Sequence, residues 1–459
     1  MKILNSAFCI AAVLATTLTG AAAVAAQLTS GPMVGAAAMR SAKVWMQADS
    51  AATAQLEYWD AAADATVSPK KQLSAAVKLS EDADFTGHFT INALEPGRKY
   101  NYRLLLDGKA VSTSQTTPES LSFSTLALWQ WRTDAPDWRL AFGSCAYTNE
   151  AAYDRLSKPY GGPPEAANIY ASIAQKKPDM MLWGGDSLYF READYDSAYG
   201  LSYRWRHTRS AAQLQPLLRT AHHYAIWDDH EFGPNDSNSS YPFKGETLKL
   251  FKQNWANPTY GLPETPGIFT TFSYNDADFF LLDNRYYRDS DKLKSDDKSK
   301  IGAAQLRWLK NALLASTASV KIIAVGGQIT NTVNTAEGWD KFPRERDDML
   351  KFLVDHNISG VLFLTGDRHF TSMMKTERPD SYPLYELTCS PMTAGLITNP
   401  KRDRDNPGVL EGTFVDQRNF CTLDFSGKKD DRKITVRSFS TEGKQLWEKQ
   451  LRVAELVKK

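Results

Sequence analysis

The sequence predicts an α/β chain in which a small all-β domain precedes a larger layered α/β domain. Short alternating runs separated by turn residues fill residues 43–125, which is typical of antiparallel strands. After Trp138, apolar runs alternate with helical patterns. Several of these runs end in polar residues, as strands do at the ligand-binding edge of an open sheet. With 459 residues, 42% of them hydrophobic, the chain is too long for one core, and we expect two or three domains.

The first 26 residues have the pattern of a secretory signal peptide. Lys2 precedes an apolar run at 7–18, and small residues follow at 23–26. The run is shorter than the ~20 apolar residues that a membrane span needs, and no later stretch supplies one. We therefore expect residues 1–26 to be removed from an exported protein that is periplasmic or extracellular and has no transmembrane segment.

Residues 27–137 are expected to form the all-β domain, an immunoglobulin- or fibronectin-like sandwich. Asp107-Gly108 is a hairpin turn signal between two of its strands. The segment has one histidine, His88, and no carboxylate cluster, so it is interpreted as a packing or substrate-flanking module. Its clearest strands are expected at 43–46, 54–59, 74–79 and 87–91, and the run 94–103 is expected to be a turn that leads into a tyrosine-bearing strand.

Residues 138–459 are expected to form the layered α/β domain. Its apolar runs that end in polar residues are 139–145, 180–186, 224–231, 321–328 and 361–369. Helical patterns are found at 168–175, 199–219, 245–255, 303–315 and 344–355. Further strands, expected from about residue 419, close the chain.

Four of the five run ends carry groups that bind cations. These groups are Cys145; Asp186 with Tyr189; Asp229 with His230 and Asn235; and Asp367 with His369. A single acid at such a place is more often a helix cap or a turn residue. Because the ends converge on one edge, the whole set predicts a metal site. Asp186 is our candidate for a carboxylate that bridges two ions about 3.5–4 Å apart.

Three cysteines remain once Cys9 leaves with the signal peptide, and an oxidising compartment favours pairing. Cys389 and Cys421 both lie in strand-like segments and could form a disulfide, which would leave Cys145 free. The alternative is that all three are small buried side chains.

Four motifs occur in a characteristic order. They are Phe142-Gly143-Ser144-Cys145, Gly185-Asp186-Ser187-Leu188-Tyr189, Trp227-Asp228-Asp229-His230-Glu231 and Gly366-Asp367-Arg368-His369. In order and spacing they resemble the metallophosphoesterases, and within them the alkaline phosphatase D (PhoD-like) group. The resemblance implies a layered metallophosphoesterase-type β-sandwich flanked by helices, after an N-terminal all-β domain.

The resemblance also implies an iron–calcium centre, with other divalent metals as alternatives. Thiolate and phenolate donors suit iron(III), whereas a mostly oxygen set suits calcium. The implied iron ligands are Cys145, Asp186, Tyr189 and His369, and the implied calcium ligands are Asp186, Asp229, Asn235 and Asp367.

Two residues outside the ligand set are candidates for catalysis and substrate binding. His230 occupies the place of a histidine that steadies the transferring oxygen in related enzymes, with a packed core histidine as the alternative. Arg285 follows an apolar run and could fork onto phosphate oxygens, while Asp283 orients it. Arg285 and Asp283 could instead be a structural ion pair.

The expected function is hydrolysis of phosphomonoesters or phosphodiesters by a metal-activated water. One alternative is a phospholipase D-type or teichoic-acid phosphodiesterase that acts on lipid or polymer esters. An alternative of another class is a non-catalytic cell-surface binding protein with a structural metal site. We expect a monomer.

A net charge of +1 gives no global attraction to nucleic acid. The basic aromatic stretch 203–209 is interpreted as structural, with its arginines facing solvent or the acidic edge, so no nucleic-acid-binding face is expected. His222 and His223 would point to opposite faces of a strand and are expected at the surface.

Overall fold

The structure is a computed structural model that describes residues 25–62, 70–112, 121–155, 160–333, 337–379 and 381–458. The predicted signal peptide therefore lies, up to residue 24, outside the described residues. Among the described residues, no helix has the length and apolar character needed to cross a bilayer.

The N-terminal part is all-β, as predicted. One sheet has the order β1-β2-β6, and a second has the order β4-β3-β7-β8, with β5 also paired to β3 and β9 to β7. Burial alternates along β7, because successive side chains of a strand point to opposite faces. The strands are β1 (Leu28–Ala37), β2 (Ala42–Ala48), β3 (Ala52–Asp60), β4 (Gln72–Leu73), β5 (Val77–Leu79), β6 (Thr86–Ile91), β7 (Lys99–Leu106), β8 (Lys109–Ala110) and β9 (Ser122–Ser124).

Two mixed six-stranded sheets form the larger part of the chain. The first has the order β12-β11-β10-β19-β20-β21, and the second has the order β13-β14-β15-β16-β18-β17. Strands β10, β11 and β12 are parallel, as are β14, β15, β16 and β18. The bounds are β10 (Trp138–Gly143), β11 (Met180–Gly184), β12 (His222–Ile226), β13 (Thr270–Tyr274), β14 (Ala277–Leu281), β15 (Val320–Val325), β16 (Val361–Thr365), β17 (Ser372–Thr376), β18 (Leu384–Thr388), β19 (Asn419–Ser426), β20 (Lys433–Ser440) and β21 (Gln445–Arg452).

Aromatic side chains join these two sheets face to face. The ring of Tyr224 in β12 stacks on Phe272 in β13 with centroids 4.1 Å apart. Trp138 in β10 packs against Phe279 in β14 at 6.1 Å. The interior between the sheets is therefore a hydrophobic core, and polar groups are left for the strand ends.

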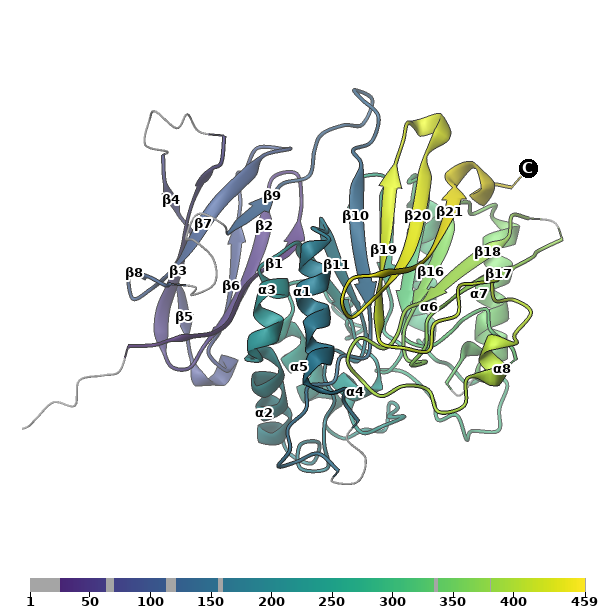
Figure 1. Cartoon of the computed structure of the whole chain (residues 1–459), viewed down its shortest axis with the longest axis horizontal. Coiled ribbons are helices and arrows are strands. Elements are labelled where there is room, and N and C mark those ends of the chain that lie inside the picture. The colour runs from purple at the N-terminus through teal and green to yellow at the C-terminus, as the bar shows by residue number, and fades with distance from the viewer. Residues whose placement is uncertain are drawn as a thin grey trace, which may run out of the picture.

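Helices flank the sheets. Figure 1 shows α1, α2, α3 and α5 on the side of the N-terminal strands, with α6 and α7 toward the opposite side. Their bounds are α1 (Asn168–Gln175), α2 (Ala198–Arg209), α3 (Gln215–Leu218), α4 (Asp229–Phe232), α5 (Lys244–Asn254), α6 (Ala303–Ala315), α7 (Pro343–Asp355) and α8 (Lys401–Arg404). Four of the five predicted helical patterns coincide with one helix each. The exception is 199–219, which is broken between α2 and α3 because Pro216 cannot continue a preceding helix.

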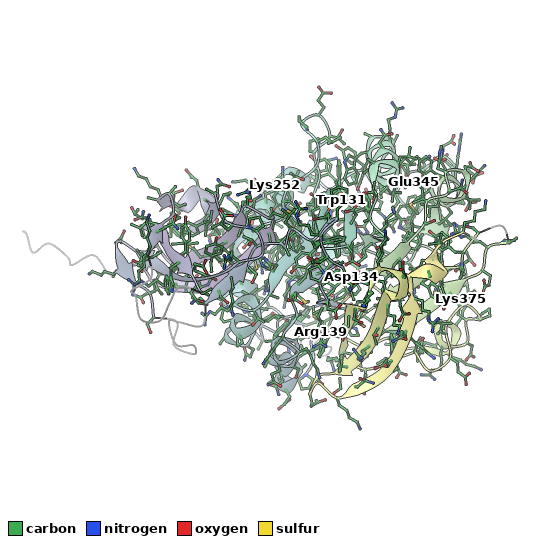
Figure 2. The ribbon with its side chains drawn as sticks, turned by 90° about the horizontal axis from the view of Figure 1, so that it is seen from above. Trp131, Asp134, Arg139, Lys252, Glu345 and Lys375 are labelled. Carbon is green, nitrogen blue, oxygen red and sulfur yellow. A yellow bond between two sulfur atoms is a disulfide. The ribbon has the colours of Figure 1, made fainter. Side chains whose placement is uncertain are left out.

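The N-terminal sheets dock directly on the larger part. Trp45 donates a hydrogen bond from Nε1 to the Gln253 carbonyl at the end of α5 (2.7 Å), and the Ala37 amide donates to the Tyr224 hydroxyl (3.0 Å). Figure 2 shows Lys252 of α5 near the purple N-terminal strands and far from the yellow C-terminal ones. These contacts lie on the α5 side of the molecule, in keeping with a packing module.

Two predictions about surface residues are wrong. His222 and His223 are buried in β12, where the imidazole of His223 accepts from Trp183 Nε1 at 3.0 Å. In α2, Arg204 is fully buried rather than solvent-facing because Asp194 and Glu150 each pair with its guanidinium at 2.7 Å. Polar side chains can be buried where partners satisfy them, and the partners here come from distant segments.

Candidate metal centre

The predicted ligands come together because parallel strands end at one edge. Cys145 follows β10, Asp186 follows β11, and Asp229 begins α4 just after β12. Asp367 follows β16 of the facing sheet. The Cys145 sulfur lies 3.4 Å from Asp186 Oδ2, so groups 41 residues apart in sequence are in contact.

Unusual backbone conformations aim these side chains into the shared space. Cys145 (φ 58°), Asp186 (φ 54°), Asp367 (φ 69°) and His369 (φ 54°) all lie in the left-handed region, directly after their strands. Residues other than glycine adopt this region rarely, at a cost on the order of 1 kcal/mol or more each. Such turns concentrate at functional sites, and here they mark four of the seven predicted ligands.

The implied iron ligands form one contiguous group. The Tyr189 hydroxyl lies 3.5 Å from Asp186 Oδ2 and 3.4 Å from His369 Nε2. Cys145 and Tyr189 are buried, at 0% and 2% exposure. A thiol, a phenol, an imidazole and a carboxylate therefore surround one small volume, the mixed donor set that suits a transition metal.

Carboxylates extend the group on its other side. Three triads each have ligand atoms within 4.8 Å of one another: Asp186, Asp229 and His230; Asp186, Asp228 and Asp367; and Asp228, Asp229 and Glu337. Asp186, Asp228 and Asp229 each belong to two triads, a placement that suits a bridging ligand, and of these three Asp186 also lies against the Cys145 sulfur.

The electrostatics of the cluster call for bound cations. Burial, with the neighbouring acids, raises the pKa of Asp186 and of Asp367 well above the usual range. Burial also raises the pKa of the Cys145 thiol to about 11. Within this cluster, three buried carboxylate oxygens accept no hydrogen bond from the described residues: Asp228 Oδ2, Asp229 Oδ1 and Asp367 Oδ2. Buried carboxylate oxygens that lack a hydrogen bond are costly, and metal ions would satisfy them, so the residues fit a metal centre.

The acids of the run Trp227–Glu231 have different roles. Glu231 accepts backbone N–H groups of Asp186 (2.8 Å), Ser187 and Asp228 (3.1 Å), and so shapes the turns that carry the ligands. Burial raises its pKa to about 7. Asp229 offers its carboxylate to the cluster.

Asp228 and Glu337 belong to the cluster, although the sequence assigned no ligand role to either. Asp228 lies in the motif 227–231, but the direction of its side chain depends on the turn after β12. It accepts a hydrogen bond from Asn284 Nδ2 at 2.7 Å. Glu337 comes from the connection between β15 and α7, which no periodic pattern singles out. Only the three-dimensional structure could have identified Glu337.

Arg285 is fully buried among these acids. Its guanidinium contacts Asp228 Oδ1 at 2.5 Å, forms an ion pair with Glu337, and lies 3.6 Å from Asp229 Oδ1. Asp283 accepts the backbone N–H of Arg285 (3.0 Å) and the indole N–H of Trp227 (2.8 Å). The guanidinium thus neutralises part of the cluster, and its contact with phosphate stays a prediction.

His230 and Tyr160 lie at the edge of the centre. The His230 ring packs 4.0 Å from the Tyr189 ring, and burial lowers the pKa of His230, which favours the neutral imidazole. The sequence did not single out Tyr160. Its side chain is 41% exposed, and its hydroxyl lies 3.4 Å from His369 Nε2, so a phenol lies between solvent and the predicted ligands.

Asn235 and Gln328 differ in their relation to the cluster. Asn235 is exposed in the segment after α4, where the next residue, Asp236, donates its N–H to Asp229 Oδ2 at 2.9 Å. A ligand role for Asn235 stays a prediction. Gln328 ends the apolar run 321–328. It is buried, and its amide donates at 2.8 Å to Oγ1 of Thr388, which is not one of the cluster residues.

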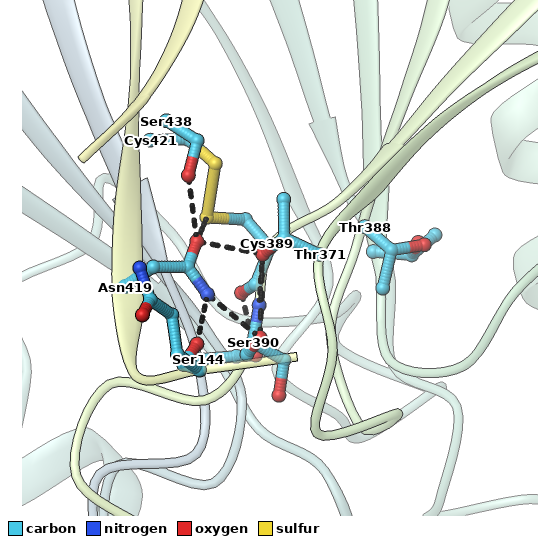
Figure 3. The surroundings of a disulfide bond; sticks show 10 residues. Ser144, Thr371, Thr388, Cys389, Ser390, Asn419, Cys421 and Ser438 are labelled. Atoms are coloured by element: carbon cyan, nitrogen blue, oxygen red, sulfur yellow. Dashed lines mark hydrogen bonds between the residues drawn. A yellow bond between two sulfur atoms is a disulfide. The ribbon is translucent and has the colours of Figure 1, made fainter. Parts of the chain in front are cut away.

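Cys389 and Cys421 form a disulfide, and Cys145 is free and buried, as predicted. Figure 3 shows the hydrogen bonds around this crosslink, which lies between β18 and β19. Ser144, beside Cys145, donates from Oγ to the Cys389 carbonyl at 3.0 Å. The crosslink is therefore one residue removed from the cluster.

Known proteins that resemble this chain include phosphatases. A family model described as PhoD-like phosphatase matches residues 140–430, and a domain of unknown function (DUF7800) matches residues 25–124. Alkaline phosphatase D of Bacillus subtilis (strain 168) is 26% identical over 333 residues, which cover 61% of this chain and 53% of that protein. The chain thus spans about half the length of this relative.

Solved structures share the fold. The structure of PhoD aligns with a TM-score of 0.74 and 18% identity, covering 94% of this chain and 91% of that one. The purple acid phosphatase PPD1 from yellow lupin (Lupinus luteus) seeds aligns with a TM-score of 0.65 and 11% identity, covering 92% and 74%. These likenesses confirm a mixed α/β architecture.

Proposed function

Because this chain belongs to the PhoD-like phosphatase family, we propose that it is a metal-dependent phosphoesterase. One observation carries the proposal: buried carboxylate oxygens without hydrogen-bond partners converge with a thiol and a phenol at one edge of the sheets. A protein gains nothing in stability from such an arrangement unless cations bind it.

We assign the metals from the chemistry of the donors. Iron(III) would be held by Cys145, Asp186, Tyr189 and His369, and calcium by Asp186, Asp229, Asn235 and Asp367, with Asp228 and Glu337 as added carboxylates. Other divalent ions could fill the oxygen-rich side. Bound metals of this kind supply an activated water and neutralise phosphoryl oxygens.

The remaining residues position groups around that chemistry. Neutral His230 can donate a hydrogen bond to an ester oxygen at the edge of the cluster. Arg285 holds Asp228 and Glu337 in place and limits the repulsion between them, and a fork onto phosphate would require it to release Glu337.

The substrates would be phosphomonoesters or phosphodiesters, with lipid and teichoic-acid diesters as the alternative. A comparison of p-nitrophenyl phosphate with its bis ester separates these classes. Metal content and hydrolysis should be measured on the same purified sample. Hydrolysis that rises with iron and calcium content supports the proposal, and a metal-loaded protein without any esterase activity supports the non-catalytic binding role.

We further propose that the protein is an exported monomer whose residues 1–26 are removed and whose N-terminal strands form an immunoglobulin- or fibronectin-like domain. The disulfide supports export, because such crosslinks persist in oxidising compartments. Mass spectrometry of protein from the periplasm or medium would show a chain that begins near residue 27. A full-length cytoplasmic protein would contradict export.

A further inference from the structure

The buried hydroxyl of Ser390 lies between two of the predicted iron ligands. Ser390 Oγ is 3.0 Å from the sulfur of Cys145, and the backbone N–H of His369 donates to the same oxygen at 3.1 Å. Ser390 and Cys145 are both 0% exposed. Because the oxygen already accepts from His369, its proton is free to point toward the sulfur.

The backbone of Ser390 is held from several directions (Figure 3). Its N–H donates to Thr371 Oγ1 at 3.1 Å, and its carbonyl accepts from Asn419 Nδ2 at 3.1 Å. The preceding residue, Cys389, is crosslinked to Cys421. A side chain on such a constrained backbone presents its hydroxyl in one direction, which is what orientation of a ligand requires.

We propose that Ser390 is a positioning residue that donates a hydrogen bond to the Cys145 sulfur and thereby orients and tunes it as a metal ligand. This inference rests on the proposed metal centre. A donor to a thiolate withdraws electron density from the sulfur, which raises the energy of sulfur-to-metal charge transfer and fixes the direction of the ligand. The Cys389–Cys421 crosslink anchors the donor.

The test uses cobalt(II) alone as a spectroscopic probe of thiolate ligation. Metal-depleted wild type, Ser390→Ala and Ser390→Thr are titrated with cobalt(II), and the charge-transfer band and dissociation constant are measured. We expect Ser390→Ala to bind cobalt about 10- to 100-fold more weakly, with the band at longer wavelength. Ser390→Thr, which keeps the hydroxyl, should restore both values.

A matched control is Ser372→Ala, which removes another buried serine hydroxyl, one without a hydrogen-bond partner among the described residues. It should match wild type in band and affinity. If Ser390→Ala does not fold, Ser390→Gly takes its place, because it also removes the hydroxyl without adding a new metal ligand, and it should give a shift in the same direction. An unchanged band and affinity in the folded variant overturn the role of Ser390.

The cobalt spectra distinguish the metal centre from the role of Ser390. If wild type shows no thiolate band with cobalt, Cys145 is not a ligand, and both this inference and the assigned metal centre fail. If wild type shows the band and Ser390→Ala leaves it unmoved, the metal centre stands and only the role of Ser390 is lost.

Discussion

Asp276 and Arg432 lie where β14 and β20 begin, whereas Asp186 and Asp367 lie where β11 and β16 end. At the first place, Arg432 contacts both carboxylate oxygens of Asp276 at 2.8 and 3.0 Å, and Trp138 Nε1 donates to the same group at 3.0 Å. At the second, burial raises the pKa of both acids, and the neighbouring carboxylates raise it further. Buried charge at the first place is balanced within the protein, whereas at the second Arg285 balances only part of it and the rest needs a bound cation.

Burial alone does not identify a functional acid. Asp276 is 5% exposed and Asp186 is 2% exposed, so their exposure is nearly the same. They differ in the partners that burial leaves them. A substitution of Asp186 should therefore lower activity and raise the stability of the metal-free protein, whereas a substitution of Arg432 should lower stability and leave activity unchanged.

The largest effect is expected from Asp186→Asn. Loss of the shared ligand should cost about 4 kcal/mol of transition-state stabilisation, roughly a thousandfold in kcat/KM. In chelator, the same change should raise the unfolding free energy by about 1–2 kcal/mol, because it removes an unbalanced buried charge. Steady-state kinetics and urea unfolding measure the two effects.

The control for this pair of measurements is Asp347→Asn, because the side chain of Asp347 is exposed on α7. Neither quantity should change in that variant. If Asp186→Asn destabilises the metal-free protein, its carboxylate is balanced within the fold, and the contrast with Asp276 breaks.

At the balanced end, Arg432→Met should cost about 3–5 kcal/mol of stability, because it leaves Asp276 buried without its partner. Folded enzyme should keep its kcat/KM and metal content. Urea unfolding with metal analysis checks this. Arg344→Met is the matched control, since Arg344 pairs with Asp297 at an exposed site. A loss of bound metal with unchanged stability would reverse the roles of the two ends.

Removal of the Cys389–Cys421 disulfide, which lies near the candidate metal centre, should lower stability by a smaller amount. Its cysteines are 32 residues apart, and the crosslink restricts the conformations of the unfolded chain. Without it, the double variant Cys389→Ala/Cys421→Ala should lose roughly 3–4 kcal/mol of unfolding free energy, because its unfolded state has more conformational entropy. Guanidinium titration of both proteins in chelator measures the loss. Equal midpoints would mean that this end of the sheets does not depend on the crosslink.

The strands and their ends were predictable because they follow from short-range pattern. The runs 139–145, 180–186 and 361–369 contain β10, β11 and β16, and the edge shared by parallel strands brings their ligands together. Residues whose placement depends on a distant partner were not predictable. Glu337 reaches the centre from a connection, and Arg204 is buried only because Asp194 and Glu150 meet it.

His223 is a third kind of buried titratable group, because its partners are neutral hydrogen-bonding groups rather than charged ones. Burial lowers its pKa to about 3, while Trp183 donates to its Nδ1 and Nε2 faces the Thr220 carbonyl at 2.8 Å, so it stays neutral. The unfolded chain binds a proton below about pH 6.5, and the folded protein does so only near pH 3. Stability should therefore fall by about 1.4 kcal/mol for each pH unit below 6.5, and be unaffected by this group above it. In His223→Gln, measured by urea unfolding from pH 7 to 5, that part of the slope should vanish. Identical slopes in the two proteins would mean that His223 is protonated in the fold and has an acidic partner.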